Sequence, residues 1–165
     1  MHGVDMNARV ARDYVDARAK FLAAARLLGG RHQAHVNPNR GPSGEELAAD
    51  TAWFGPQQAE KLLVLVSATH GIEGFCGSGA QLDWLLGPGL SEIAPDTALL
   101  VVHAINPHGF AWQRRVTEEG CDLNRNFVDF SKALPDNPGY DELADALLPA
   151  ELSGPAYDRA EAKIR

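Results

Sequence analysis

The sequence predicts an α/β fold, with a mostly parallel or mixed central sheet and helices on both of its faces. Two apolar runs, Leu62–Ala68 and Ala98–Ala104, have the length and composition of strands that are buried on both sides. Between them, Ser78–Leu86 has the pattern of a helix, which Gly87-Pro88-Gly89 ends. A strand, a helix and a strand of these lengths are typical of a right-handed βαβ unit, whose strands are parallel.

An apolar stripe near the start predicts a helix from about Asn7 to Leu28. Apolar side chains recur there at steps of three and four residues, at Val10, Tyr14, Ala17, Phe21, Ala24 and Leu28. Asn7 or Asp5 can cap the start of this helix, and the pair Gly29-Gly30 can stop it.

Extended segments are expected between this helix and the βαβ unit. A short extended piece around Gln33–Val36 leads to a turn at Asn39–Pro42. Alternating side chains favour a strand around Leu47–Phe54, which Gly55-Pro56 ends. In a fold of this class the loops at the carboxyl ends of the strands are the natural place for a functional site.

Two further helices are expected towards the C-terminus. Leu143, Leu147 and Leu148 indicate a short helix that Pro149 ends, and another helix begins near Pro155. This last helix runs to the end of the sequence without a cap or a stop signal. We therefore expect residues 1–165 to be the N-terminal portion of a single domain, cut short.

Composition and charge narrow the classes of partner. The 165 residues suit one domain with its own core, since 45% are hydrophobic and 22% charged. The formal net charge of -7 argues against nucleic acid or an anionic membrane as a partner. No apolar run approaches the roughly 18 residues that span a bilayer. The two cysteines, Cys76 and Cys121, form no disulfide framework, so we expect reduced thiols in a cytoplasmic protein.

The turn after the first buried run carries a candidate metal site. His70 and Glu73 offer an imidazole nitrogen and a carboxylate oxygen, which are ligands that zinc accepts. Gly71 and Gly74 allow the backbone to curl, so that both side chains can point at one spot. The spacing also arises often by chance, and the alternative is a pair of polar residues in a surface loop.

A second polar group lies at Asp122–Phe127. The guanidinium of Arg125 and the amide of Asn124 suit a substrate carboxylate, because they offer charge-assisted and neutral hydrogen bonds. The alternative is that Arg125 pairs with an acid such as Asp129, while Asn124 and Asn126 make turn hydrogen bonds.

A pair of arginines, Arg114 and Arg115, lies just upstream of that group. An arginine buried near a metal could stabilise an oxyanion. An exposed pair beside Glu118 and Glu119 is the alternative, a surface cluster that contributes little.

Taken together and in order, these motifs resemble the zinc carboxypeptidase superfamily. The order is H-x-x-E after a buried strand, Asn106–Gly109 after the next strand, the arginine pair, and then Asp122–Phe127. Within the superfamily the sequence is most similar to the bacterial carboxypeptidase-like group long catalogued as a domain of unknown function. The stretch Ser67–Phe127 carries the resemblance, which implies the zinc-carboxypeptidase type of α/β fold.

The resemblance implies a role for each candidate residue. His70 and Glu73 match two ligands of one zinc ion, and Asp122 matches the carboxylate that supports the ligand histidine. Asn124 and Arg125 match the pair that holds the terminal carboxylate of a substrate. Arg115, or else Arg114, matches the arginine that polarises the scissile carbonyl.

The implied activity is zinc-dependent hydrolysis of an amide bond next to a free carboxylate, in a peptide or an N-acyl amino acid. The D-x-N-R signature does not separate a carboxypeptidase from an aspartoacylase-like deacylase. The family's third zinc ligand and its general base, a later histidine and glutamate, have no counterpart up to Arg165. The alternative is therefore an inactive fragment, or a domain that needs a partner chain. A shortened sheet would also expose an edge for self-association.

A binding domain without catalysis is a further reading of the glycine-rich turn. Gly71, Gly74, Gly77 and Gly79 lie between a strand and a helix, where a phosphate can bind. The turn lacks the G-x-G-x-x-G spacing and the Walker lysine, and Glu73 would repel a phosphate. We therefore regard this reading as weaker than the metal site.

Overall fold

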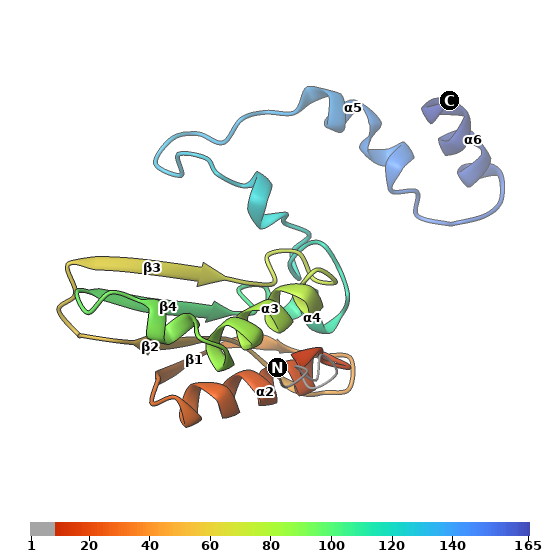
Figure 1. Ribbon diagram of the computed structural model, residues 1–165. Coiled ribbons are helices and arrows are strands. Elements are labelled where there is room, and N and C mark those ends of the chain that lie inside the picture. The colour runs from red at the N-terminus through yellow and green to blue at the C-terminus, as the bar shows by residue number, and fades with distance from the viewer. Residues whose placement is uncertain (1–8) are drawn as a thin grey trace. The chain divides into compact units, whose positions relative to one another are not determined.

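The computed structural model describes residues 9–165 and shows an α/β fold with a four-stranded mixed sheet (Figure 1). The strands are β1 (Arg31–Arg40), β2 (Glu46–Phe54), β3 (Lys61–Val66) and β4 (Thr97–His103), in the order β1-β2-β4-β3. β2 is antiparallel to both of its neighbours, whereas β3 and β4 are parallel. The α/β class and the mixed sheet are thus confirmed. The chain divides into two compact units, Met1–Phe127 and Val128–Arg165.

The helices of the first unit pack on one face of the sheet, so the prediction of helices on both faces is wrong for the described residues of this unit (Figure 1). They are α2 (Tyr14–Leu27), α3 (Gly74–Leu86) and α4 (Pro107–Ala111), with a 3-10 turn at Gly89–Glu92 and another at Leu123–Arg125. The predicted βαβ unit is present as β3, α3 and β4, and β3 pairs with β4 along its whole length. α3 begins four residues before the predicted start, because the glycines of the turn take helical conformation.

The N-terminal helix begins later than predicted. Asp13 caps α2, since its side chain accepts a hydrogen bond of 2.8 Å from the backbone nitrogen of Asp16. Val10 precedes the helix and is half exposed, so it does not belong to the buried stripe. The caps that we predicted, Asn7 and Asp5, lie outside the described residues.

The hydrophobic core fills one face of the sheet. One cluster joins α2, α3, β2 and β4 through Phe21, Ala25, Ala52, Phe54, Leu85, Leu99 and Val101. Leu65 of β3 packs against the same cluster, so the odd-numbered side chains of β3 face the core. This arrangement holds β3 and β4 in place from the side of α2 and α3.

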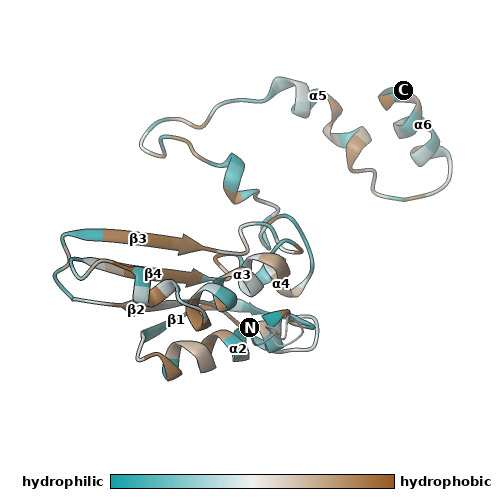
Figure 2. Ribbon diagram, viewed as in Figure 1, coloured by the Kyte–Doolittle hydropathy of each residue, from teal (hydrophilic) through white to brown (hydrophobic). Residues whose placement is uncertain are grey.

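The prediction that β3 is covered on both faces is wrong for the described residues. β3 is an edge strand, and Leu62, Val64 and Val66 keep 45–50% of their surface exposed. Figure 2 shows β3 and β4 as hydrophobic strands along most of their length. An apolar run indicates that a strand is suited to burial, but it does not show what covers the strand.

A buried polar network joins α2 to the sheet. Asp50 on β2 is fully buried and accepts hydrogen bonds from Arg18 Nε at 2.7 Å, with His32 Nε2 at 2.8 Å from its other oxygen. Nearby, His103 at the end of β4 is also fully buried, and its Nε2 lies 2.9 Å from Ser78 Oγ. These contacts provide partners for polar groups that would otherwise be costly to bury.

The second unit consists of α5 (Pro138–Leu147) and α6 (Pro155–Ile164), which confirms both helices predicted there. Asn137 caps α5, and the two helices are linked by Lys163 Nζ, which donates to the backbone oxygen of Glu142. No helix within residues 9–165 is both long and apolar enough to cross a membrane.

Candidate functional site

The site lies at the carboxyl ends of the neighbouring parallel strands β3 and β4. Within two residues of the end of each strand the chain takes a left-handed conformation, with φ of 59° at Ala68 and 56° at Ala104. The two turns are bonded to each other, since Ile105 N donates to Ser67 O at 3.1 Å and Asn106 N to Ala68 O at 3.2 Å. Non-glycine residues rarely adopt this conformation, so the turns are held by their surroundings. No sequence signal marked these alanines.

Asn106 fixes the loop that carries His70. Its side chain is 2% exposed, donates from Nδ2 to Thr69 O at 3.3 Å and accepts from Gly109 N at 2.8 Å. The residue before His70 is therefore attached to the start of α4. This agrees with an architectural role for the turn at Asn106-Pro107.

Gly71 brings a second backbone segment against the same loop. Its nitrogen donates to Arg114 O at 2.9 Å. A Cβ at position 71 would lie 1.9 Å from Gly109 O and 2.1 Å from Arg114 O, so the space admits glycine and no larger residue. Arg114 thus supports the site through its main chain, while its side chain is exposed.

His70 lies between two carboxylates. Its Nδ1 is 3.2 Å from Glu73 Oε2, and its Nε2 is 2.9 Å from Asp122 Oδ1. The histidine side chain is 11% exposed, whereas that of Glu73 is 66% exposed. The other oxygen of Asp122 accepts from Arg115 Nε at 2.8 Å. Four of the residues singled out in the sequence thus form one connected network.

The electrostatics of this network fix the state of Asp122. The hydrogen bond with His70, together with those from Arg115 and the backbone nitrogen of Asn124, outweighs the opposing effect of burial and lowers the pKa of Asp122 to about 2. An ionised Asp122 accepts a proton-bearing nitrogen, so Nε2 is the protonated nitrogen and the Nδ1 lone pair points towards Glu73. A positive species, either a proton or a metal cation, is needed between these two acceptors.

The side chains of Asn124 and Arg125 do not take part in this network. Arg125 is exposed, and its Nη1 donates to Asn124 O at 3.1 Å. The alternative partner Asp129 instead bonds to Lys132 Nζ at 3.0 Å and to Ser131. Among the described residues Arg125 forms no ion pair, so its guanidinium remains available to a ligand.

Two side chains, those of His70 and Glu73, face one position as possible ligands of a metal ion. Within residues 9–165 there is no group of three or more histidine, cysteine, aspartate or glutamate side chains arranged to hold a metal ion. Asp122 bonds to the far nitrogen of the ring, so it does not point at the spot that Nδ1 and Glu73 share. A complete zinc site would need a further donor.

A hollow of about 370 Å³ lies against the loop that carries Asp122. Cys121 and Leu123, on either side of Asp122, line it together with Asn106, Glu118 and Asn126. Glu118 is held there by Asn37 Nδ2 at 2.8 Å. The hollow thus offers space for a small polar ligand next to this loop, although His70, Glu73, Arg115 and Asp122 do not line it.

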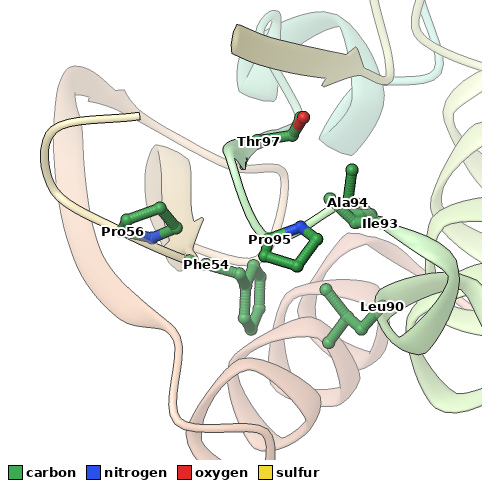
Figure 3. A pocket seen from close by; sticks show the side chains of 8 residues that line it. Phe54, Pro56, Leu90, Ile93, Ala94, Pro95 and Thr97 are labelled. Atoms are coloured by element: carbon green, nitrogen blue, oxygen red, sulfur yellow. The ribbon is translucent and has the colours of Figure 1, made fainter. Parts of the chain in front are cut away.

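The pocket in Figure 3 lies at the other end of the sheet. Its volume is about 160 Å³, and it is lined by Phe54, Gly55, Pro56, Leu90, Ile93, Ala94, Pro95 and Thr97. Thr97 begins β4, whereas His70 follows the carboxyl end of the parallel strand β3. This pocket has no titratable side chain and carries none of the candidate chemistry.

The pair of Ser78 and His103 does not form a second active site. The contact of 2.9 Å resembles that of a nucleophile and its base, but Ser78 is 1% exposed and His103 is fully buried. No substrate can reach the hydroxyl in this fold.

Comparisons with known proteins give a family and partial structural similarities. The model described as "Protein of unknown function (DUF2817)" matches residues 10–165. No curated protein matches the sequence. The fold is similar to part of a metallo-carboxypeptidase from Burkholderia cenocepacia, at 16% identity and a TM-score of 0.47, over 68% of this chain and 32% of that chain.

Two further solved structures show similarities of the same kind. One is a Zn-dependent exopeptidase from Parabacteroides distasonis, at 14% identity and a TM-score of 0.38, over 88% of this chain and 52% of that chain. The other is glutaminyl cyclase from Porphyromonas gingivalis, at 15% identity and a TM-score of 0.37, over 60% and 40% of the two chains. This chain therefore spans about a third to a half of the length of these proteins.

Proposed function

This chain belongs to the DUF2817 family, and we propose that it carries part of the active site of a zinc-dependent hydrolase, which cleaves an amide bond next to a free carboxylate. The observation that supports this most is the position of His70 between Glu73 and an ionised Asp122. Its free nitrogen faces a carboxylate at a distance that calls for a cation.

The two donors fit a zinc ion. Ligands about 2.0–2.1 Å from a tetrahedral zinc lie about 3.3 Å apart, which is close to the 3.2 Å between Nδ1 and Glu73 Oε2. Asp122 on the opposite nitrogen is the kind of partner that fixes the tautomer and orientation of a ligand histidine. His70 and Glu73 would hold the ion, and a third donor would come from elsewhere.

The residues around the donors have complementary tasks in this proposal. When bound, zinc would supply Lewis acidity towards a carbonyl and lower the pKa of water. Arg115 holds Asp122 through Nε and keeps other N–H groups that could stabilise an oxyanion. The exposed Arg125, with Asn124, would bind the free carboxylate of the substrate. Substrates of this class are peptides, at their C-terminal residue, and N-acyl amino acids.

A second candidate function follows from the small number of donors. Because two side chains face the proposed metal position, the chain by itself could bind zinc weakly and lack catalysis. It would then act as a domain whose site is completed by a partner chain. Zinc binding and hydrolysis therefore have to be measured separately.

Zinc titration tests the metal site. We expect His70→Ala to weaken zinc binding at least about tenfold, because it removes one of two donors. His35→Ala is the matched control, since His35 is an exposed histidine on β1. The zinc affinity of this variant should equal that of the parent chain. Isothermal titration calorimetry gives both affinities. Equal binding by the His70→Ala variant and the parent would overturn the proposed site.

Hydrolysis assays then separate the two candidates. Release of an amino acid from peptides or from N-acyl amino acids, lost in the His70→Ala variant, supports a complete enzyme. Zinc binding through His70 without release from either substrate supports the second candidate.

The contribution of Asp122 can be measured without a substrate. We expect Asp122→Asn to weaken zinc binding about tenfold to a hundredfold, because the ligand ring loses the carboxylate that fixes its tautomer. Competition with a zinc-sensitive dye gives the affinity, and the far-ultraviolet circular dichroism should stay unchanged. Unaltered affinity would show that Asp122 contributes to the surface network but not to the metal site.

A further inference from the structure

The loop that leads from α4 to Asp122 contains a turn whose shape is fixed by its own hydrogen bonds. Thr117 N donates to Cys121 O at 2.9 Å, Gly120 N to Thr117 O at 3.0 Å, and Cys121 N to Thr117 Oγ1 at 3.2 Å. Gly120 supplies the left-handed conformation that the turn needs, with φ of 77°. Arg115 lies before the turn and Asp122 directly follows it. The turn therefore brings Arg115 Nε to within 2.8 Å of Asp122 Oδ2.

Beyond Arg114, one further contact fixes where this turn lies against the sheet. Glu118 Oε1 accepts hydrogen bonds from Asn37 Nδ2 at 2.8 Å and from Asn39 Nδ2 at 3.3 Å, both on β1. The two asparagines are 81 and 79 residues away from Glu118 in the sequence. Among the described residues, no other hydrogen bond connects residues 116–121 to another segment of the chain.

The irregular end of β1 holds these two amides in place. The register of β1 with β2 is irregular around Pro38, which has no N–H to pair. Asn39 N donates instead to Asn37 Oδ1 at 2.8 Å, and Asn39 Nδ2 donates to the same oxygen at 3.2 Å. Because Oδ1 is occupied in this way, the Nδ2 donor of Asn37 is turned towards Glu118. The contact thus joins a preformed pair of donors to one carboxylate oxygen.

The charge of Glu118 strengthens this contact. Burial raises the pKa of Glu118, but hydrogen bonds from Asn37 and Asn39 are among the effects that outweigh it, so the pKa lies below its ordinary value. Hydrogen bonds to an ionised carboxylate are stronger than those between neutral groups. Within residues 9–165 Glu118 forms no ion pair, whereas Arg115 pairs with Asp122. Glu118 therefore leaves the arginine to the site.

We propose that Glu118 is a positioning residue of the candidate site. Its contact with β1 holds the 117–121 turn at the place from which Asp122 reaches His70. The loop of His70 is attached to the sheet by separate contacts, so the 2.9 Å between His70 Nε2 and Asp122 Oδ1 depends on where the turn lies. The consequence for zinc rests on the metal site proposed above, whereas the anchoring of the turn does not.

The reactivity of Cys121 measures the anchoring without any metal. Cys121 closes the turn and is half-buried, and it is the one thiol left in a chain that carries Cys76→Ser. In metal-free buffer we expect Glu118→Ala to raise the rate of reaction with DTNB at least about threefold, because the turn opens more often. Glu118→Gln should keep the rate of the parent, since its amide oxygen still accepts from Asn37. Glu119→Ala is the matched control, because Glu119 is an exposed neighbour without a hydrogen bond among residues 9–165, and its rate should not change.

Exchange of donor and acceptor tests the contact itself. Asn37→Asp places a second carboxylate against that of Glu118, and the repulsion should raise the thiol rate as Glu118→Ala does. Addition of Glu118→Gln to this variant should restore the rate of the parent, because the new amide at position 118 donates to the carboxylate at position 37. An unchanged rate in the Glu118→Ala variant, or no recovery in the double variant, would overturn the proposal.

Zinc affinity tests the consequence for the metal site. Glu118→Ala should weaken zinc binding about threefold to tenfold, whereas Glu118→Gln and Glu119→Ala should bind as the parent does. In a chain that already carries Asp122→Asn, Glu118→Ala should have no further effect, because it acts through Asp122. Unaltered affinity, or equal losses in both backgrounds, would overturn the positioning role. If the parent binds no zinc, the proposed metal site fails, and the thiol rates decide whether Glu118 anchors the turn.

Discussion

Replacement of Gly71 by alanine is expected to destabilise the first unit by at least about 3 kcal/mol. The reason is space rather than conformation, because the new Cβ would lie 1.9 Å from Gly109 O and 2.1 Å from Arg114 O. Both atoms belong to the backbone, so no side chain can rotate to relieve the clash. The loop must separate from α4, which also breaks the hydrogen bond from Gly71 N to Arg114 O.

Urea unfolding followed by tryptophan fluorescence measures this loss. All three tryptophans, Trp53, Trp84 and Trp112, lie within the first unit. Gly79→Ala is the matched control, since a Cβ there meets its nearest described atom, Arg9 O, at an ordinary 3.6 Å. Because Gly79 lies inside α3, its replacement should leave stability unchanged or raise it by up to about 1 kcal/mol. Equal stability of the Gly71→Ala variant and the parent would refute the close packing of this loop.

The same substitution connects stability to the proposed metal site. His70 follows Thr69, which Asn106 holds, and precedes Gly71, which Arg114 holds. If the loop moves, Nδ1 no longer lies 3.2 Å from Glu73, and zinc binding should fall with stability. His70→Ala should instead remove zinc binding while the fold is retained. Comparison of the two variants separates damage to the loop from loss of a ligand.

Local patterns in the sequence predicted the elements that carry this site. The aliphatic runs of β3 and β4 and the helix between them are strong signals, because strand and helix periodicity depend on neighbouring residues. The sequence also singled out His70, Glu73, Asp122 and Arg115, which the structure brings into one network. These residues lie in loops, which have no periodicity to interpret. Their spacing indicated a site because it resembles the motifs of a known family.

Other features depended on contacts that the sequence does not encode locally. Burial of β3 was predicted on both faces because aliphatic residues favour it, yet the partner for one face is not specified by the strand itself. Asp13 caps α2, although Asn7 and Asp5 are equally good residues for a cap, because the buried stripe starts only at Tyr14. The choice between Arg114 and Arg115 also depended on such contacts, although the sequence favoured Arg115. In the structure Arg115 Nε donates to Asp122, whereas the carbonyl oxygen of Arg114 accepts from Gly71 N.

Two histidines near the ends of neighbouring parallel strands have different roles because their surroundings differ. His70 follows β3, keeps 11% of its side chain exposed and lies between carboxylates. His103 ends β4, is fully buried, stacks on Phe21 with ring centroids 4.6 Å apart and bonds to Ser78. The first histidine can attract a cation, whereas the second contributes to the core. Their predicted responses to metal therefore differ.

Acid is expected to destabilise the first unit by about 3 kcal/mol through His103 alone. Burial, opposed by Asp50 and assisted by Arg18, lowers the pKa of His103 to about 4. In the unfolded chain the same group titrates near its ordinary value of 6.5. Between these two values the unfolded state binds a proton that the folded state does not, so stability falls as the pH falls from about 6.5 to about 4. Above 6.5 the contribution is fully present, and below 4 it decreases no further.

Urea unfolding between about pH 7 and pH 4 isolates this contribution when the parent is compared with His103→Gln. Glutamine does not titrate and can still bond to Ser78 Oγ, but it loses the stacking on Phe21. We expect the variant to be less stable at pH 7 by about 1–3 kcal/mol and to lose about 3 kcal/mol less on acidification. His35→Gln, at an exposed histidine on β1, should keep the pH dependence of the parent. If His103→Gln loses as much stability on acidification as the parent, then the buried neutral His103 is not the source of the acid sensitivity.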